Sequence, residues 1–262
     1  MRKIYLLISI LTFSTSFSQI QKGIIYYGYI EALDIGYTKG LDYNSYMLFN
    51  NEQSYYVTAK DSLETRDKIN KKQSFTSDGG GEVSSYDGMK VSPQGDQVVN
   101  NIKKKTIWSN LLHGKQIYVK EITPKINWKI TNEIKKIGKF TCKKAITTFR
   151  GRDYTAWFTN EIAIPFGPWK LNGLPGLILE AYDTNKFVYW YFKSVEYPTK
   201  NKEQVKYIKI PKDNQFMSYQ GFKFYQKKDL EKIMDKQKIV QKKFPNVIFG
   251  EFKTSNMFIE FE

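Results

Sequence analysis

The chain has 262 residues, of which 41% are hydrophobic and 16% aromatic, a composition that excludes a disordered chain and favours β-strands. Its formal net charge of +15 is carried mostly by Lys. Because planar recognition of phosphate favours Arg, we expect no nucleic-acid partner. A single Cys and a single His exclude an intramolecular disulfide and a zinc site of Cys and His ligands, so no metal or cofactor is expected.

Residues 1–18 have the pattern of a signal peptide. Arg2 and Lys3 precede an uncharged apolar run over 4–13, which is about half of the roughly twenty residues that a membrane-spanning helix requires. The small residues Ser16 and Ser18 fit a cleavage site before Gln19. We therefore expect an exported protein that is periplasmic, outer-membrane associated or secreted, and not an integral membrane protein. Residues 19–262 are predicted to form a single domain.

Short aromatic and β-branched runs, separated by turn-forming residues, predict an antiparallel sheet. The polar and glycine-rich segment 60–97 predicts a mobile loop, and hairpin turns are predicted at 150–153 and 183–186. The expected strands are 24–30, 46–49, 55–59, 116–121, 127–131, 140–149, 154–159, 177–182 and 187–195.

One long helix is predicted over 227–243, with Pro245 after its end. We expect it to pack on one face or at the mouth of the sheet. The fold class is therefore mainly β: a curved antiparallel sheet or half-barrel with one long C-terminal helix. By analogy alone, this outline is similar to the LolA-type lipoprotein carriers. The helix face that would contact the sheet comprises Leu230, Ile233, Met234, Gln237 and Val240.

No arrangement of residues predicts a catalytic site, so a noncatalytic protein is favoured. Cys142 lies in the alternating stretch 139–149 and is interpreted as a small buried residue; pairing with His113 as nucleophile and base is the alternative. Several carboxylates fall near strand ends, but no pair has a spacing that requires a shared site. These carboxylates are Glu133, Asp153, Glu161, Glu180 and Asp183.

The most distinctive segment is 167–180. Within it, Pro175 sets φ for the first central position of a turn and Gly176 supplies a positive φ for the second, so a type II turn is predicted. The turn leads into an apolar strand, which favours a structural role. The alternative is that this segment forms one wall of a ligand groove. The ligand-binding residues would then be Trp157, Trp169, Leu174 and Ile178.

The hexapeptide Gly173-Leu174-Pro175-Gly176-Leu177-Ile178 resembles the signature of the GLPGLI family. The resemblance implies an exported protein of Bacteroidetes and related bacteria that shares the family fold. The family carries no established activity that could be transferred. Further agreement lies in Trp157-Phe158-Thr159, Ile162, Ile164-Pro165, Gly167-Pro168, Trp128-Lys129-Ile130, Ile137-Gly138, Cys142 and Ala145.

Three functional hypotheses follow from an exported, aromatic-rich sheet. The leading one is a noncatalytic binding or carrier module of the cell envelope that holds an apolar or peptide ligand in an aromatic concavity. The second is an interaction subunit that docks on an outer-membrane or secretion complex through its basic surface and its sheet edges. The third is a hydrolase that acts on an envelope polymer.

Overall fold

The computed structural model describes residues 21–32, 40–70, 73–75, 84–86, 89–113, 115–200, 215–246 and 259–261. The predicted signal peptide over 1–18 lies outside these residues. Among the residues described, no helix combines the length and apolar content that crossing a membrane requires.

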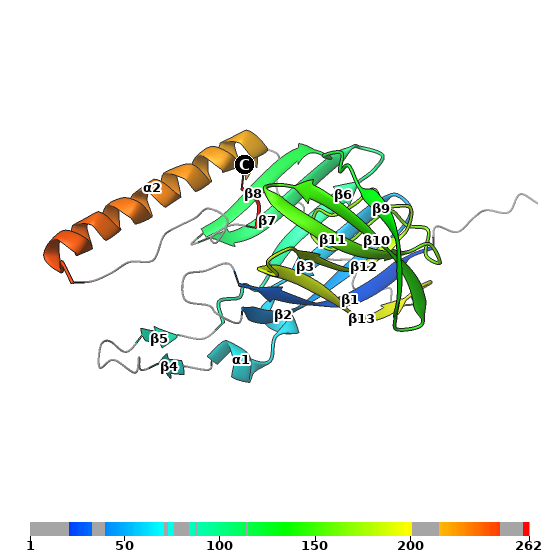
Figure 1. The fold of residues 1–262 in the computed structure, drawn as a ribbon, viewed down its shortest axis with the longest axis horizontal. Coiled ribbons are helices and arrows are strands. Elements are labelled where there is room, and N and C mark those ends of the chain that lie inside the picture. The colour runs from blue at the N-terminus through cyan, green and yellow to red at the C-terminus, as the bar shows by residue number, and fades with distance from the viewer. Residues whose placement is uncertain are drawn as a thin grey trace, which may run out of the picture.

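Twelve of the described strands form one large curved sheet in the order β14-β8-β7-β6-β3-β2-β1-β13-β12-β11-β10-β9 (Figure 1). Neighbouring strands are antiparallel except for β14 and β8, which are parallel. The β-rich, mainly antiparallel fold class is thereby confirmed. The strands are β1 (Gly23–Glu31), β2 (Leu41–Phe49), β3 (Gln53–Thr58), β6 (Asp96–Asn101), β7 (Thr106–His113), β8 (Lys115–Ile122), β9 (Lys129–Ile137), β10 (Phe140–Phe149), β11 (Arg152–Thr159), β12 (Leu177–Asp183), β13 (Val188–Glu196) and β14 (Phe216–Ser218).

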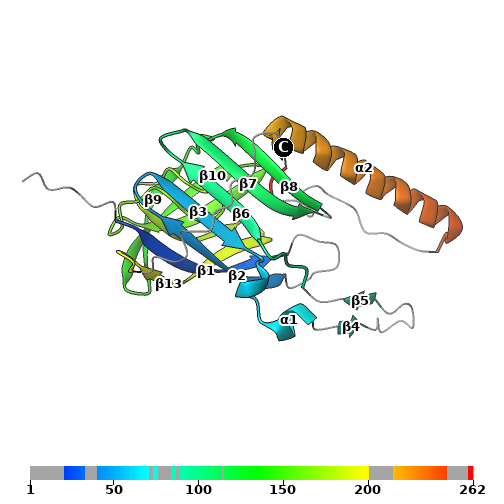
Figure 2. The same cartoon turned by 180° about the vertical axis from the view of Figure 1, so that it is seen from behind.

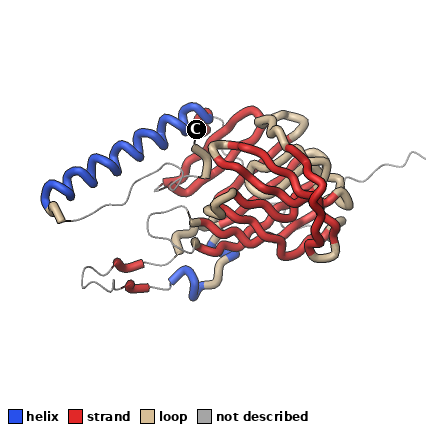
Figure 3. Tube along the Cα trace, in the orientation of Figure 1, coloured by secondary structure: helices blue, strands red, loops and turns tan. Residues whose placement is uncertain are grey.

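Short elements stand outside this sheet. The segment between β3 and β6 contains the 3-10 helix η1 (Asp61–Leu63), the helix α1 (Arg66–Asn70) and a separate pair of strands, β4 (Gln73–Phe75) and β5 (Ser84–Tyr86). The long helix α2 (Tyr219–Lys243) follows β14. Strands dominate the chain trace in Figure 3.

The two predicted hairpins are confirmed, because β10 pairs with β11 and β12 with β13 in antiparallel register. The turn between β10 and β11 consists of Arg150 and Gly151, which both have a positive φ, of 53° and 78°. A two-residue turn of this kind matches the right-handed twist of the strands that it joins.

Alternation along β10, shifted once by a bulge between Lys143 and Ala145, shows how the sequence builds the sheet. Phe140, Cys142 and Phe149 are buried, whereas the side chains between them include exposed Lys and Thr residues. We call the face that carries Cys142, Tyr154 and Trp190 the inner face, and the opposite one the outer face. The segment 160–176 packs on the inner face, because Phe166, Trp169 and Leu171 belong to the same buried cluster as Cys142, Tyr154 and Trp190. Burial of this apolar surface supplies most of the driving force for folding.

The structure corrects the turn predicted at Gly176. Gly173 has the positive φ, of 90°, and Gly176 does not. Instead, a Cβ at Gly176 would lie 2.1 Å from the carbonyl oxygen of Thr159. The glycine is therefore required because two backbone segments approach closely, and no type II turn is involved.

Helix α2 is longer than predicted and packs differently. Its N-terminal turn contacts β8, where Tyr219 and Phe222 form a buried cluster with Ile117 and Val119. The rest of the helix extends away from the sheet in both views (Figures 1 and 2). The expectation that its central apolar face packs on the sheet is wrong, since Met234 and Val240 are 42% and 37% exposed.

Candidate functional site

The four residues predicted to bind a ligand are all buried. Trp169, Leu174 and Ile178 are 5%, 1% and 0% exposed within the inner core, and Trp169 stacks on Trp190 with ring centroids 6.1 Å apart. Trp157 is 8% exposed and pairs with Glu180 across β11 and β12. Ligand binding by these side chains stays a prediction, and in this structure they pack the fold.

The carboxylates singled out in the sequence do not form a cluster, and each has its own partner. Glu180 accepts a hydrogen bond from Lys135 Nζ at 2.7 Å, Glu133 from Lys144 Nζ at 2.9 Å, and Asp183 from Arg152 at 2.9 Å. Asp153 accepts a hydrogen bond from the hydroxyl of Thr148, and Glu161 accepts one from the backbone amide of Thr141. The described residues contain no group of three or more His, Cys, Asp or Glu that could hold a metal ion.

Cys142 is a buried thiol, as predicted. Its side chain is inaccessible, and burial raises the pKa of the thiol to about 11. A thiol with such a pKa is a poor nucleophile near neutral pH, because the thiolate is the reactive form. The side chain of His113 lies outside what the structure describes, so the distance between His113 and Cys142 is not given by the structure.

Three partly exposed tyrosines lie side by side on the outer face of β12 and β13. Tyr182 of β12 and Tyr189 of β13 are directly paired, with their ring centroids 5.6 Å apart and their planes nearly perpendicular. Tyr191 follows on the same face of β13, 5.8 Å from Tyr189. All three are partly exposed. We call Tyr182, Tyr189 and Tyr191 the tyrosine belt.

Gly28 of β1 leaves the space that the ring of Tyr191 occupies. Tyr191 is paired with Gly28, and a Cβ on Gly28 would lie 1.9 Å from Cζ of the tyrosine ring. The ring therefore lies over the backbone of β1, where any larger residue would displace it. Its hydroxyl reaches across β1 and donates to both carboxylate oxygens of Asp42 on β2, at 3.1 and 3.2 Å.

Charged groups border the belt on several sides. Lys186 Nζ lies 5.7 Å from the centre of the Tyr182 ring, and Lys193 Nζ lies 5.5 Å from that of Tyr191. Partial burial raises the pKa of Tyr189, and the negative charge of Glu180 raises it further. Partial burial also raises the pKa of Tyr191, with a smaller contribution from Asp42. The phenols of Tyr189 and Tyr191 therefore stay neutral, and the belt and its neighbours offer ring faces, hydroxyl groups and carboxylates together.

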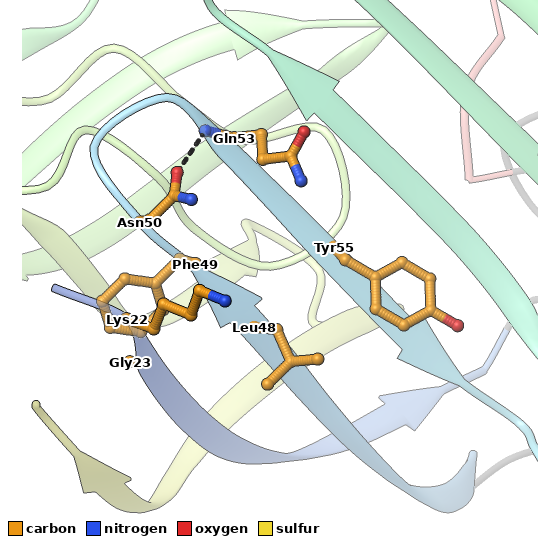
Figure 4. A pocket seen from close by; sticks show the side chains of 7 residues that line it. All are labelled: Lys22, Gly23, Leu48, Phe49, Asn50, Gln53 and Tyr55. Atoms are coloured by element: carbon orange, nitrogen blue, oxygen red, sulfur yellow. Dashed lines mark hydrogen bonds between the residues drawn. The ribbon is translucent and has the colours of Figure 1, made fainter. Parts of the chain in front are cut away.

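A shallow pocket of about 350 Å³, which includes open solvent, lies near the β2–β3 turn (Figure 4). Leu48 and Tyr55 form its apolar wall, and Lys22 contributes its one charged side chain. Asn50 Oδ1 accepts a hydrogen bond from the backbone amide of Gln53 at 2.9 Å, which orders the turn. No carboxylate, histidine or cysteine side chain within the described part of the chain lines the pocket.

A model of the family described as N-glycanase peptide, N-terminal domain, matches residues 86–221, which is more than half of the chain. The chain belongs to this family. The matched region of this N-glycanase N-terminal domain includes all three belt tyrosines, whereas Asp42 lies before it. The resemblance to the GLPGLI family rests on the hexapeptide and its flanking residues and stays a prediction.

Two solved structures of PNGF-II, in the P21 and C2 space groups, are similar to the chain, with sequence identities of 17% and 16%. Their TM-scores are 0.49 and 0.47, and the matches cover 78% and 76% of this chain. They cover only 32% and 31% of the PNGF-II chains, so this chain spans about a third of their length. No curated protein sequence matches it.

Sequence reasoning did not find the belt. Tyr182, Tyr189 and Tyr191 fall within strands that were predicted, and their spacing of two residues along β13 places Tyr189 and Tyr191 on one face. That signal was present in the sequence. Nothing in the sequence indicated that Asp42 lies beside Tyr191, because the two residues are 149 positions apart along the chain.

Proposed function

We propose that this protein is an exported, noncatalytic glycan-binding module of the cell envelope. The description of its family names an N-glycanase, an enzyme class directed at N-linked glycans, and the matched part is the N-terminal domain. Export is supported by the basic and apolar pattern of residues 1–13. The noncatalytic role is supported by the five carboxylates near strand ends, each of which is bonded to a separate partner.

The tyrosine belt is the observation that carries the proposal. A sugar ring has an apolar face of C–H groups and a rim of hydroxyl groups. A partly exposed tyrosine can pack against that face with its ring, and a neighbouring carboxylate can accept hydrogen bonds from the hydroxyl groups. Tyr189 and Tyr191, with Glu180 and Asp42 beside them, provide both kinds of contact within one short stretch of sheet.

The inner face offers a ligand less room. Trp169 and Trp190 stack there with their planes 12° apart, and Tyr154 lies 6.3 and 6.4 Å from their centres. Rings packed in this way occupy the space that the concavity would offer to an apolar ligand. We therefore place the ligand on the outer face, and we propose a glycan in place of the apolar or peptide ligand suggested by composition.

Isothermal titration calorimetry tests this proposal. The probes are a glycopeptide that carries an N-linked core glycan and the same peptide without the glycan. We expect the glycopeptide alone to bind the protein. Tyr189→Ala and Tyr191→Ala should each weaken binding about tenfold, because each removes one ring from the contact surface, worth roughly 1 to 2 kcal/mol.

Tyr225→Ala is the matched control, since Tyr225 is also partly exposed but lies on α2. The affinity of this variant for the glycopeptide should equal that of the unaltered protein. Equal binding of both probes would show that the ligand is a peptide. Unchanged affinity in the two belt variants would show that the belt is not the binding surface.

A further inference from the structure

Residues 259–261 lie against the turn between β10 and β11 and the first turns of α2, where the C-terminal end is marked in Figure 1. Each of the three residues is held by its main chain. Arg152 Nε donates to the carbonyl oxygen of Ile259 at 2.9 Å, and Gln226 Nε2 donates to that of Glu260 at 3.0 Å. The amide of Phe261 donates to the carbonyl oxygen of Arg150 at 3.2 Å. Main-chain hydrogen bonds also hold peptides that are bound to a receptor.

The side chain of Glu260 enters a buried site with positive charge. Lys170 Nζ lies 2.8 and 2.9 Å from the two carboxylate oxygens, and Arg150 Nε lies 3.7 Å from one of them. The Glu260 and Lys170 side chains are 1% and 0% exposed. The guanidinium of Arg150 lies 3.5 Å from the centre of the Tyr219 ring, which covers the site from α2.

Charge balance shows why this site requires a carboxylate. Lys170 and Arg150 both contact Glu121, so without Glu260 two buried cations would share one anion. Arg152 is already neutralised by Asp183 at 2.9 Å. An uncompensated buried charge is strongly unfavourable. Together, Lys170, Arg150 and Glu121 therefore form a receptor with one unit of positive charge, which Glu260 neutralises.

Gly151 completes the receptor. A Cβ at this position would lie 2.1 Å from the carbonyl oxygen of Phe261, so only glycine lets the peptide backbone approach the turn. Arg152 also lies over the Phe261 ring, 5.0 Å from its centre, and Ile259 packs against the inner core. The site therefore accommodates an aliphatic residue, a carboxylate and an aromatic residue in succession.

We propose that Lys170, Arg150, Arg152 and Gly151 form a binding site for an acidic peptide segment, and that residues 259–261 occupy it as an internal ligand. The ligand class is a short peptide with the pattern aliphatic, Glu, aromatic. A segment with this pattern from a partner protein binds the same site when it displaces residues 259–261. This proposal does not rest on glycan binding, because the site is separate from the tyrosine belt.

The test uses the full chain with Glu260→Ala and two terminally blocked peptides, Ile-Glu-Phe and Ile-Gln-Phe. We expect the substitution to lower the melting temperature by about 10 °C, because it leaves a buried cation unpaired. A saturating concentration of the Glu peptide should restore about 3 to 6 °C, and the Gln peptide should restore nothing. Glu231→Ala, which removes an exposed carboxylate on α2, is the control that no peptide should affect.

If Glu260→Ala does not fold, the same peptides are added to the unaltered chain, and hydrogen exchange of the Phe261 amide is followed. The Glu peptide should accelerate this exchange by competing for the site, and the Gln peptide should not. Equal effects of the two peptides in either assay, or no effect of the Glu peptide, would overturn the proposal. Glycopeptide binding by the belt is measured independently, so failure of one proposal leaves the other intact.

Discussion

Trp190 and Tyr191 are consecutive residues of β13, yet they face opposite environments. Trp190 is fully buried, stacks on Tyr29 at 5.1 Å, and donates its indole N–H to the hydroxyl of Tyr56 at 2.8 Å. Tyr191 is partly exposed and bonds only at its hydroxyl end, to Asp42. Because successive side chains of a strand point to opposite faces, one step along the chain separates a packed ring from a partly exposed one.

The comparison teaches that aromatic content alone does not locate a binding surface. On the inner face, the rings contact one another and the segment 160–176. On the outer face, the belt tyrosines have neighbours on one side and solvent on the other. We therefore expect substitutions on the inner face to lower stability and substitutions in the belt to lower affinity.

The largest effect is expected on the inner side of the fold, at Gly176. Gly176→Val should destabilise the protein by more than about 4 kcal/mol, because the new Cβ would meet the carbonyl oxygen of Thr159. Gly173→Ala is the matched comparison, since an added Cβ there has open space and only the positive φ opposes it. That variant should lose about 1 to 2 kcal/mol.

Urea denaturation of the two glycine variants measures the difference. Gly176→Asn should behave like Gly176→Val, because the clash arises at Cβ. A mild effect of Asn together with a large effect of Val would instead indicate the left-handed turn that the sequence suggested.

The next effect separates the two faces of β13 directly. Trp190→Ala should cost about 3 to 5 kcal/mol, because it leaves a large cavity among stacked rings. Tyr189→Ala should cost less than about 1 kcal/mol, because its ring is already partly in solvent. Thermal melts of both variants measure this difference. Similar losses at the two positions would mean that the outer face of β13 is also core.

Cys142 gives a smaller effect that depends on pH. At pH 7, Cys142→Ala should cost about 1 to 2 kcal/mol, since the buried thiol is replaced by a smaller side chain. The thiol has a pKa of about 11 in the folded state, above its ordinary value of 9.0. Ionisation therefore favours the unfolded chain, and the advantage of Cys142 over Ala should be complete below pH 9 and decline as pH rises toward 11.

Denaturation of both proteins at several pH values checks this prediction. The comparison with Cys142→Ala removes the contribution of other groups that titrate in the same range. A difference that stays constant between pH 7 and pH 11 would show that the thiol is accessible to water in the folded protein.

The sequence predicted strands in runs rich in aromatic and β-branched residues. Strand β10 was predicted over its full range, although its alternation shifts at a bulge between Lys143 and Ala145. Strands β6 and β7 were missed because they bury polar side chains. Gln97 donates to the hydroxyl of Tyr55 at 2.7 Å and accepts from Asn110 at 3.1 Å, and such partners are not visible in sequence.

The candidate sites were less predictable than the fold, because they join residues that are distant in sequence. Lys170 and Glu260 are 90 residues apart. The hexapeptide lies in the same segment as Lys170. The sequence correctly indicated that position 176 requires glycine. The physical reason, however, is the close approach of two backbone segments and not a turn. Local turn chemistry could not reveal that contact.

Hydroxyl-radical footprinting with mass spectrometry tests the central claim most directly, namely that the outer face of β12 and β13 binds a glycan and the inner face of these strands packs. The protein is oxidised briefly with and without the N-glycosylated peptide. We predict that the glycopeptide lowers oxidation of Tyr182, Tyr189 and Tyr191 several-fold and leaves Tyr225 unchanged. Unchanged oxidation of the belt tyrosines at a glycopeptide concentration that saturates binding would contradict the account.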